Sequence, residues 1–227
     1  MSRPVQIPRW KRILDVVFIL LMLPLVLPVS ALIGLLIVLL SRGPVLFKQE
    51  RVGFMGRRFI CLKFRTMRVD AETSTHQGHL RHLIDSNAPM VKLDAHGDSR
   101  IIPFGLLLRS SGLDELPQLF NVLRGEMSLV GPRPCMPYEN DKYLPWQHER
   151  FNTLPGLTGL WQVSGKNRTT FNEMMELDIK YVRTKSLWLD LMIILKTLPV
   201  MAKEVWDARQ RKKRSRIRPS PSCHPNA

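Results

Sequence analysis

An uninterrupted apolar run near the start of the chain limits most strongly what this protein can fold into. From Val16 to Leu40 there are 25 residues without a single charge. A helix of that length reaches about 37 Å at ~1.5 Å per residue, enough to cross the ~30 Å hydrocarbon core of a bilayer. The run is too long for the apolar part of a signal peptide and no small-residue cleavage motif closes it. We therefore expect it to stay in the mature protein as a membrane segment.

Two prolines in the run predict a dip into the membrane rather than a span. Pro24 and Pro28 have no backbone N–H, so the carbonyls of Leu20 and Pro24 lose their helical donors. An interior proline costs a helix roughly 3 kcal/mol, and lipid offers no water to compensate. Each arm beside the break would be ~16–18 Å long, close to one leaflet of the bilayer. We therefore expect a re-entrant, helix–break–helix anchor.

Basic residues on both sides of the run favour the same topology. Under the positive-inside rule a spanning helix has one basic end, whereas a re-entrant helix returns both ends to the cytoplasmic face. Here the basic residues before the run are Arg3, Arg9, Lys11 and Arg12, and those after it are Arg42, Lys48, Arg51, Arg57 and Arg58. A proline-kinked spanning helix remains the alternative.

The hydrophobic pattern becomes strand-like after the apolar run. Val45–Arg51 and Arg58–Met67 predict two strands joined by a glycine-containing turn at 53–56. In the second strand Lys63 and Arg65 are two residues apart, so they would share one face.

The remainder of the chain predicts helices separated by a long irregular segment. We expect helices over 101–109, from about 115 to 123, over 171–184 and over 187–206. The last of these could lie at a membrane interface or pack in the core. Residues 131–170 are rich in Gly and Pro, and so long an irregular segment is usually functional.

The expected fold class is α+β and mainly helical. Residues 1–44 would form a basic flank and the re-entrant membrane helix, 45–208 a compact cytosolic domain with a small β-hairpin, and 209–227 a basic disordered tail. The chain carries 34 Lys and Arg against 19 Asp and Glu, a formal net charge of +15. This charge favours anionic partners: phosphate groups, nucleic acid or a lipid headgroup surface. Three scattered cysteines indicate a reducing environment rather than a disulfide framework.

Asp114 and Glu115 are the acidic pair best placed for chemistry. They open a helix, because Pro117 is tolerated only in a first helical turn. Taken alone, Asp114 is an N-cap and Glu115 complements the helix dipole. Cations around the pair make it a candidate for phosphoryl chemistry, in which one acid attacks phosphorus and the other holds a magnesium ion. These candidate phosphate-binding residues are Lys63, Arg65, Arg109, Arg133, Lys166 and Arg168.

Several ordered motifs give the chain a family resemblance. They stand as Lys-Arg-Ile-Leu-Asp at 11–15, Lys-Phe-Arg-Thr-Met at 63–67, Arg109, Leu-Asp-Glu-Leu-Pro-Gln-Leu-Phe-Asn at 113–121, Gly-Glu-Met-Ser-Leu-Val-Gly-Pro-Arg-Pro at 125–134, Pro-Gly-Leu-Thr-Gly-Leu-Trp-Gln-Val at 155–163 and Leu-Asp-Ile-Lys-Tyr-Val at 177–182. With these motifs the chain resembles the bacterial sugar transferases that act as monotopic polyprenyl-phosphate phosphoglycosyl transferases. The resemblance covers about residues 11–200, nearly the whole chain apart from the tail.

The resemblance implies a reaction, partners and a location. Such enzymes transfer a phospho-sugar from a UDP-sugar to undecaprenyl phosphate and release UMP, the first membrane-committed step in making surface glycans such as exopolysaccharide and lipopolysaccharide. They act at the cytosolic face of the bacterial inner membrane and do not bind nucleic acid. A homodimer and contact with downstream glycosyltransferases are left open, and so is the identity of the sugar.

The resemblance also implies roles for particular residues. Asp114 would be the nucleophile that forms a covalent phospho-sugar intermediate, and Glu115 would bind Mg²⁺. The family's basic phosphate-binding positions fall on Lys63, Arg109 and Arg133, and the break of its membrane helix falls on Pro28.

Two other classes of protein are the alternatives. A non-enzymatic basic protein that binds a membrane or nucleic acid would explain the charge, and its binding would depend strongly on salt but not on Asp114. That class gives no reason for an Asp-Glu pair among arginines. A polytopic phosphoglycosyl transferase needs many membrane spans, whereas this chain has one apolar run.

Overall fold

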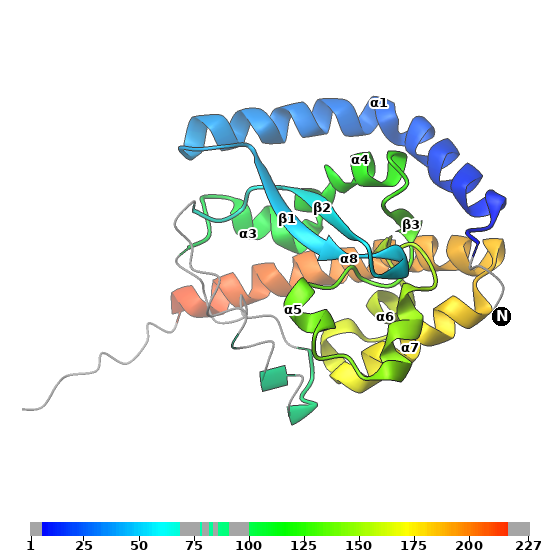
Figure 1. Cartoon of the computed structure of the whole chain (residues 1–227). Helices are drawn as coiled ribbons and strands as arrows, with labels where there is room; N and C mark the ends of the chain where they lie inside the picture. The colour runs from blue at the N-terminus through cyan, green and yellow to red at the C-terminus, as the bar shows by residue number, and fades with distance from the viewer. Residues whose placement is uncertain (1–5, 69–77, 79–81, 84–85, 91–99, 218–227) are drawn as a thin grey trace, which may run out of the picture.

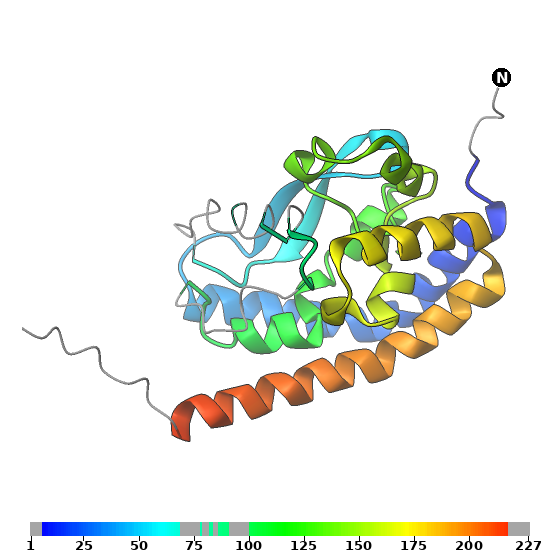
Figure 2. The ribbon, with the colours of Figure 1, turned by 90° about the horizontal axis from the view of Figure 1, so that it is seen from below.

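Two long helices frame the molecule (Figures 1 and 2). The computed structural model describes residues 6–68, 78, 82–83, 86–90 and 100–217. Helix α1 (Arg9–Leu40) arches over one side of the domain, and α8 (Leu187–Ile217) runs along another. Between them lie an antiparallel hairpin, a short parallel pair of strands and a set of short helices.

The predicted hairpin is confirmed. Strand β1 (Leu46–Val52) pairs antiparallel with β2 (Arg58–Phe64), with Gln49 opposite Cys61. The turn between them is a 3-10 segment, η1 (Phe54–Gly56). Strand β2 ends earlier than the predicted Met67, because after Phe64 the chain turns toward the end of α1.

A second sheet lies where the sequence predicted only irregular structure. Strand β3 (Ser128–Val130) pairs in parallel with β4 (Gly156–Thr158). Their glycines allow a very close backbone approach: a Cβ on Gly131 would lie 2.2 Å from the Leu154 carbonyl oxygen, and one on Gly156 would lie 2.0 Å from the Gly131 nitrogen. The Gly-Pro-Arg-Pro and Pro-Gly-Leu-Thr-Gly motifs are therefore packed directly on each other.

Replacing Gly156 with alanine is expected to destabilise the protein by about 3 kcal/mol, because the new Cβ overlaps a rigid backbone. A thermal melt in detergent should show the midpoint falling by about 6 to 12 °C. The matched control is Gly34→Ala on α1, where a Cβ would meet Val45 at an ordinary 3.5 Å. Equal melting temperatures for the two variants would contradict the close packing of β3 on β4.

Helix α1 differs from the predicted helix–break–helix. It is assigned as one helix from Arg9 to Leu40, with Pro24 and Pro28 inside it and exposed. The helix bends instead of breaking (Figure 1), which is how a helix commonly accommodates an interior proline. It is long and apolar enough to cross a membrane, but only 11% of its most apolar window is buried. The buried residues lie toward its two ends, and Ile19, Ile33 and Ile37 are among them.

The other helices are short, apart from α7 and α8. Helix α7 (Phe171–Thr184) has the predicted bounds, whereas α3 (Gly105–Ser111) begins later than the predicted 101. Helix α8 continues to Ile217, so the prediction of disorder from residue 209 is wrong up to that point, since Arg, Lys and Gln are good helix formers. Residues 218–227 lie outside the described part. The remaining helical segments are α3 (Gly105–Ser111), η3 (Leu113–Glu115), α4 (Gln118–Leu123), α5 (Pro137–Asn140), η4 (Pro145–Phe151), α6 (Leu160–Val163), η5 (Lys166–Arg168) and α7 (Phe171–Thr184).

A fully buried ionic cluster, the Lys11 cluster, joins the starts of α1 and α8. It consists of Lys11, Tyr181 and Asp190, all at most 1% exposed. Lys11 Nζ donates to Asp190 Oδ2 at 2.6 Å, to the Tyr181 hydroxyl at 2.7 Å and to the Val130 carbonyl at 2.6 Å. One helical turn further on, Asp15 accepts from the backbone N–H of Leu129 at 2.9 Å. The first turns of α1 are therefore part of the core of the domain and hold β3 in place.

Two flanking cations thus have roles that the sequence did not predict. Lys11, counted as part of the basic flank, has no exposed surface to offer a headgroup. Arg12 donates to the carbonyls of Val122 and Leu123 at the end of α4. These side chains fix α1 to the domain, so charge counting overestimates the cationic surface beside the anchor.

Candidate active site

The Asp114–Glu115 pair lies in a sharp change of direction between α3 and α4. Gly112 ends α3 in the left-handed conformation (φ +70°), which lets the chain turn directly into η3. Asp114 is 8% exposed, whereas the Glu115 side chain is 34% exposed. The pair therefore combines one inward and one accessible carboxyl group.

Lys63 binds the accessible carboxyl. Its Nζ lies 2.6 Å from Glu115 Oε1, and the two side chains come from β2 and η3. Burial raises the pKa of Glu115, but Lys63 and the charges of Arg133 and Lys166 outweigh it and lower this pKa to about 2. Glu115 is thus a carboxylate at physiological pH, and three of the predicted cations act on it.

Asn121 fixes the distance between strand β2 and the segment 113–123, which carries Glu115. It lies on α4, is 0% exposed, and its Oδ1 accepts from the backbone N–H of Leu62 at 3.0 Å. Its Nδ2 donates to the Ile60 carbonyl at 2.7 Å and to Glu126 at 2.6 Å. The segment 113–123 is therefore attached to β2 by Asn121 as well as by Glu115. This role of Asn121 was not predicted. A polar amide among the apolar residues of α4 is the sequence feature that could have indicated it.

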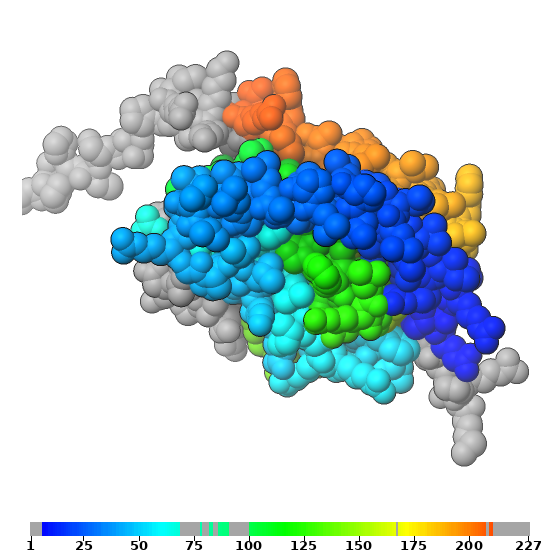
Figure 3. Space-filling model, turned by 90° about the horizontal axis from the view of Figure 1, so that it is seen from above, coloured from blue at the N-terminus to red at the C-terminus, as the bar shows by residue number. Residues whose placement is uncertain are grey.

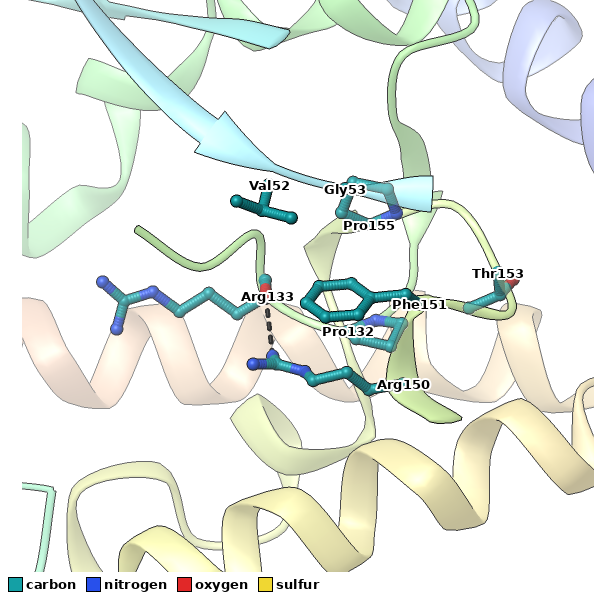
Figure 4. Close-up of a pocket in the computed structure, with 8 residues that line it drawn as sticks. All are labelled: Val52, Gly53, Pro132, Arg133, Arg150, Phe151, Thr153 and Pro155. Carbon is teal, nitrogen blue, oxygen red and sulfur yellow. Dashed lines mark hydrogen bonds between the residues drawn. The ribbon is translucent and has the colours of Figure 1, made fainter. Parts of the chain in front are cut away.

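Two buried arginines hold the backbone beside Arg133. Arg150 donates to the Arg133 carbonyl at 2.7 Å (Figure 4). It also donates to Asp178 at 2.6 Å. Arg51 donates to the next carbonyl, that of Pro134, at 3.0 Å. Arg51 was counted among the flanking cations and Arg150 was not singled out, because buried arginines look like surface charges in a sequence.

The cavity beneath this loop does not bind substrate. It has a volume of about 10 Å³, which is room for one water molecule at most. Figure 4 shows the Arg133 side chain directed away from Pro132, Phe151 and Pro155. The guanidinium is thus free of the packed loop and acts electrostatically on Glu115.

The remaining predicted cations fall into different settings. Arg109, in the last turn of α3, donates to Thr66 Oγ1 at 3.4 Å. Lys166 pairs with Glu204 of α8 at 2.6 Å. Arg168 is exposed on η5.

Arg65, predicted to bind phosphate on the same face as Lys63, is buried against the end of α1. Arg65 is 4% exposed and donates to the Ser41 carbonyl at 2.9 Å and to the Arg42 carbonyl at 2.5 Å. Arg65 is the residue directly after β2, and its backbone N–H donates to the Val45 carbonyl at 2.9 Å, which holds it beside the end of α1. Arg65 instead closes the carbonyl end of α1.

Comparison with known proteins identifies the family. The family model described as "Bacterial sugar transferase" matches residues 7–204. The chain belongs to the bacterial sugar transferase family. That match includes Asp114, Glu115 and all six predicted phosphate-binding cations, and it confirms the family that the sequence motifs indicated.

Three bacterial sugar transferase relatives show how the similarity is distributed. The UDP-glucose:undecaprenyl-phosphate glucose-1-phosphate transferase of Caulobacter vibrioides is 44% identical, over 83% of this chain and 68% of its own length. Galactosyl transferase CpsE of Streptococcus agalactiae is 45% identical, over 70% of this chain and 35% of its own. Exopolysaccharide production protein ExoY of Sinorhizobium fredii is 36% identical, over 84% of both chains. The chain thus spans about a third of CpsE but most of ExoY.

The acidic pair of this sugar transferase fits the magnesium ion that the family resemblance implies. No cluster of three or more His, Cys, Asp or Glu able to hold a metal occurs within the described residues. Mg²⁺ commonly uses one or two carboxylates and completes its shell with water and substrate phosphates. Glu115 is ionised and one-third exposed, and Asp114 adjoins it. The residues therefore suit an ion that arrives with a diphosphate.

Proposed function

We propose that this protein transfers a phospho-sugar from a UDP-sugar to undecaprenyl phosphate, releasing UMP, with Asp114 as nucleophile. The observation that carries the proposal is the acidic pair at η3, with Lys63 bound to Glu115 at 2.6 Å and with Arg133 and Lys166 acting on the same carboxylate. The names of the Caulobacter and streptococcal relatives, one a glucose-1-phosphate transferase and one a galactosyl transferase, support a hexose donor.

The proposed chemistry proceeds in two displacements at one phosphorus atom. An Asp114 carboxylate oxygen attacks the phosphorus that bears the sugar, and the bond to the UMP phosphate breaks, so UMP leaves with the electron pair. An oxygen of undecaprenyl phosphate then attacks the same phosphorus and releases the Asp114 carboxylate. Arg109, Arg133 and Lys63 would neutralise phosphate charge in both steps. A magnesium ion held by Glu115 would supply further neutralisation of the diphosphate.

We place the protein on the cytosolic face of the inner membrane, and the packing of α1 supports a re-entrant anchor there. Lys11 and Ile19 near the start of the helix, and Ile33 and Ile37 near its end, pack against the same domain. A straight span would carry one of these ends away from the domain. Figure 3 shows α1 lying across one face of the molecule, with α8 on one side of it and the β1–β2 hairpin on the other.

Helix α8 also supports a position of the domain at the membrane surface. It packs in the core through Ile193, so one of the two settings predicted for this helix is present. Its other side exposes Trp188, Leu195, Leu198 and Trp206, which lie within about 80° of one another around a helix of 3.6 residues per turn. Tryptophans at the two ends of an apolar stripe are typical of a helix at a membrane interface.

The reaction is tested by UMP release. Detergent-solubilised full-length protein would be incubated with Mg²⁺, undecaprenyl phosphate and, in turn, UDP-glucose, UDP-galactose and UDP-N-acetylhexosamines. We expect release with one class of donor, dependent on undecaprenyl phosphate for multiple turnovers, and loss of release when EDTA removes the metal. Folded protein that released UMP from none of these donors would contradict the proposal and favour a basic, non-enzymatic membrane protein.

A further inference from the structure

The Lys63–Glu115 contact occupies the very carboxylate that a divalent cation would use. Both side chains are partly exposed, 23% for Lys63 and 34% for Glu115, so the pair lies at the open side of the site. Their backbones are held by β2 and by the Asn121 contacts. Lys63 has a long flexible side chain, so the ammonium can move while the carboxylate stays where it is.

An ammonium and a divalent cation repel each other strongly at contact distance. The two cations therefore compete for the Glu115 carboxylate, and the competition is stronger because Arg133 and Lys166 already make the surroundings positive. If the Lys63 ammonium left Glu115 and no ligand brought a further anion, it would face the positive charges of Arg133 and Lys166. A diphosphate in the site would provide that anion.

We propose that Lys63 is an exchangeable counter-ion: it holds Glu115 in the empty site and moves to a diphosphate oxygen when Glu115 takes a divalent cation. The inference rests on the proposed function and adds a coupling between its two ligands. A cation on Glu115 releases Lys63 for the diphosphate, and a diphosphate draws Lys63 away from Glu115. The cation and the diphosphate therefore bind more tightly together than separately. By linkage this coupling is the same in both directions.

The test is Mn²⁺ binding to the full-length protein in detergent, measured from the electron paramagnetic resonance of free Mn²⁺ with and without UDP, after correction for the Mn²⁺ that the same UDP binds without protein. Mn²⁺ is suitable because, like Mg²⁺, it prefers oxygen ligands. For Lys63→Met we expect the Kd for Mn²⁺ alone to fall roughly two- to fivefold, the upper part of the range for removing a partly exposed ion pair. The factor by which UDP tightens Mn²⁺ binding should shrink by the same amount.

Lys166→Met is the matched control, because Lys166 also acts on Glu115 but its Nζ pairs with Glu204. It removes the same charge and should change the Kd for Mn²⁺ less. Unchanged or weaker Mn²⁺ binding by Lys63→Met, or an equal effect of Lys166→Met, would overturn the exchange. The exchange would also be overturned if UDP did not lower the Kd of the wild-type protein for Mn²⁺. That result needs no variant.

Glu115→Gln separates failure of this inference from failure of the proposed function. In the Lys63→Met background it should abolish the gain in Mn²⁺ affinity. If the double variant kept the tight binding, Mn²⁺ would be bound elsewhere and the exchange would be overturned. UMP release by the wild-type protein would still establish the transfer reaction.

Discussion

Replacing Asp114 with asparagine is expected to reduce UMP release by about 10⁴-fold or more. The amide has nearly the same shape as the carboxyl but cannot attack phosphorus, so the loss falls on the chemical step. Asp114 lies in η3, where Gly112 supplies the turn, and neither feature needs a charge on the side chain. Membrane association and the melting temperature should stay close to those of the wild type.

Asp141→Asn is the control for this experiment. Asp141 is an exposed residue at the end of α5, and its substitution removes the same charge far from η3 in the sequence. Its rate of UMP release should match the wild type. Near-normal release by Asp114→Asn would contradict the nucleophile assignment, whatever the control showed.

Replacing Lys11 with methionine is expected to destabilise the protein by about 3 to 5 kcal/mol. The change leaves the Asp190 carboxylate buried without its cation, and breaking a buried ion pair from one side costs about this much. A thermal melt in detergent should show a midpoint lower by on the order of 10 °C. The Val130 carbonyl also loses a donor, three residues before Arg133, so UMP release should decline as well.

Two further variants separate this cluster from a general effect of charge. Lys180→Met removes a lysine from an exposed position beside Tyr181 and should change the stability by less than about 0.5 kcal/mol. Asp190→Asn added to Lys11→Met removes the unpaired charge, so the double variant should lose less stability than the sum of the two single changes. Additive losses would show that Lys11 and Asp190 do not act as a pair.

Local patterns predicted the elements that depend on local sequence. The hairpin followed from two short strand-like segments around a glycine turn, and α7 from a helical segment that begins with a Thr170–Glu173 capping box. Pro117 predicted a helix that opens at the Asp114–Glu115 pair; in the structure the pair lies in the short turn η3, and α4 begins only at Gln118. These features are decided by neighbours within a few residues, which the sequence displays directly.

Features that depend on distant contacts could not be predicted in the same way. The β3–β4 pair has only three residues per strand and forms because Gly131 and Gly156 permit close approach. Lys11 looked like a flanking charge, yet its partner Asp190 is 179 positions away in the chain. Arg65 looked like a phosphate ligand, whereas its guanidinium donates to the Ser41 carbonyl at the end of α1. In each case the role of a residue depends on a partner that sequence spacing does not reveal.

The most direct measurement is the intact mass of the protein after incubation with Mg²⁺ and its UDP-sugar, without undecaprenyl phosphate. We predict that the mass rises by one phospho-sugar, that a single equivalent of UMP appears, and that undecaprenyl phosphate removes the added group. Peptide mapping should place the group on Asp114, and Asp114→Asn should not acquire it. Repeated UMP release by a protein whose mass never changes would contradict a covalent intermediate and favour direct transfer between the two substrates.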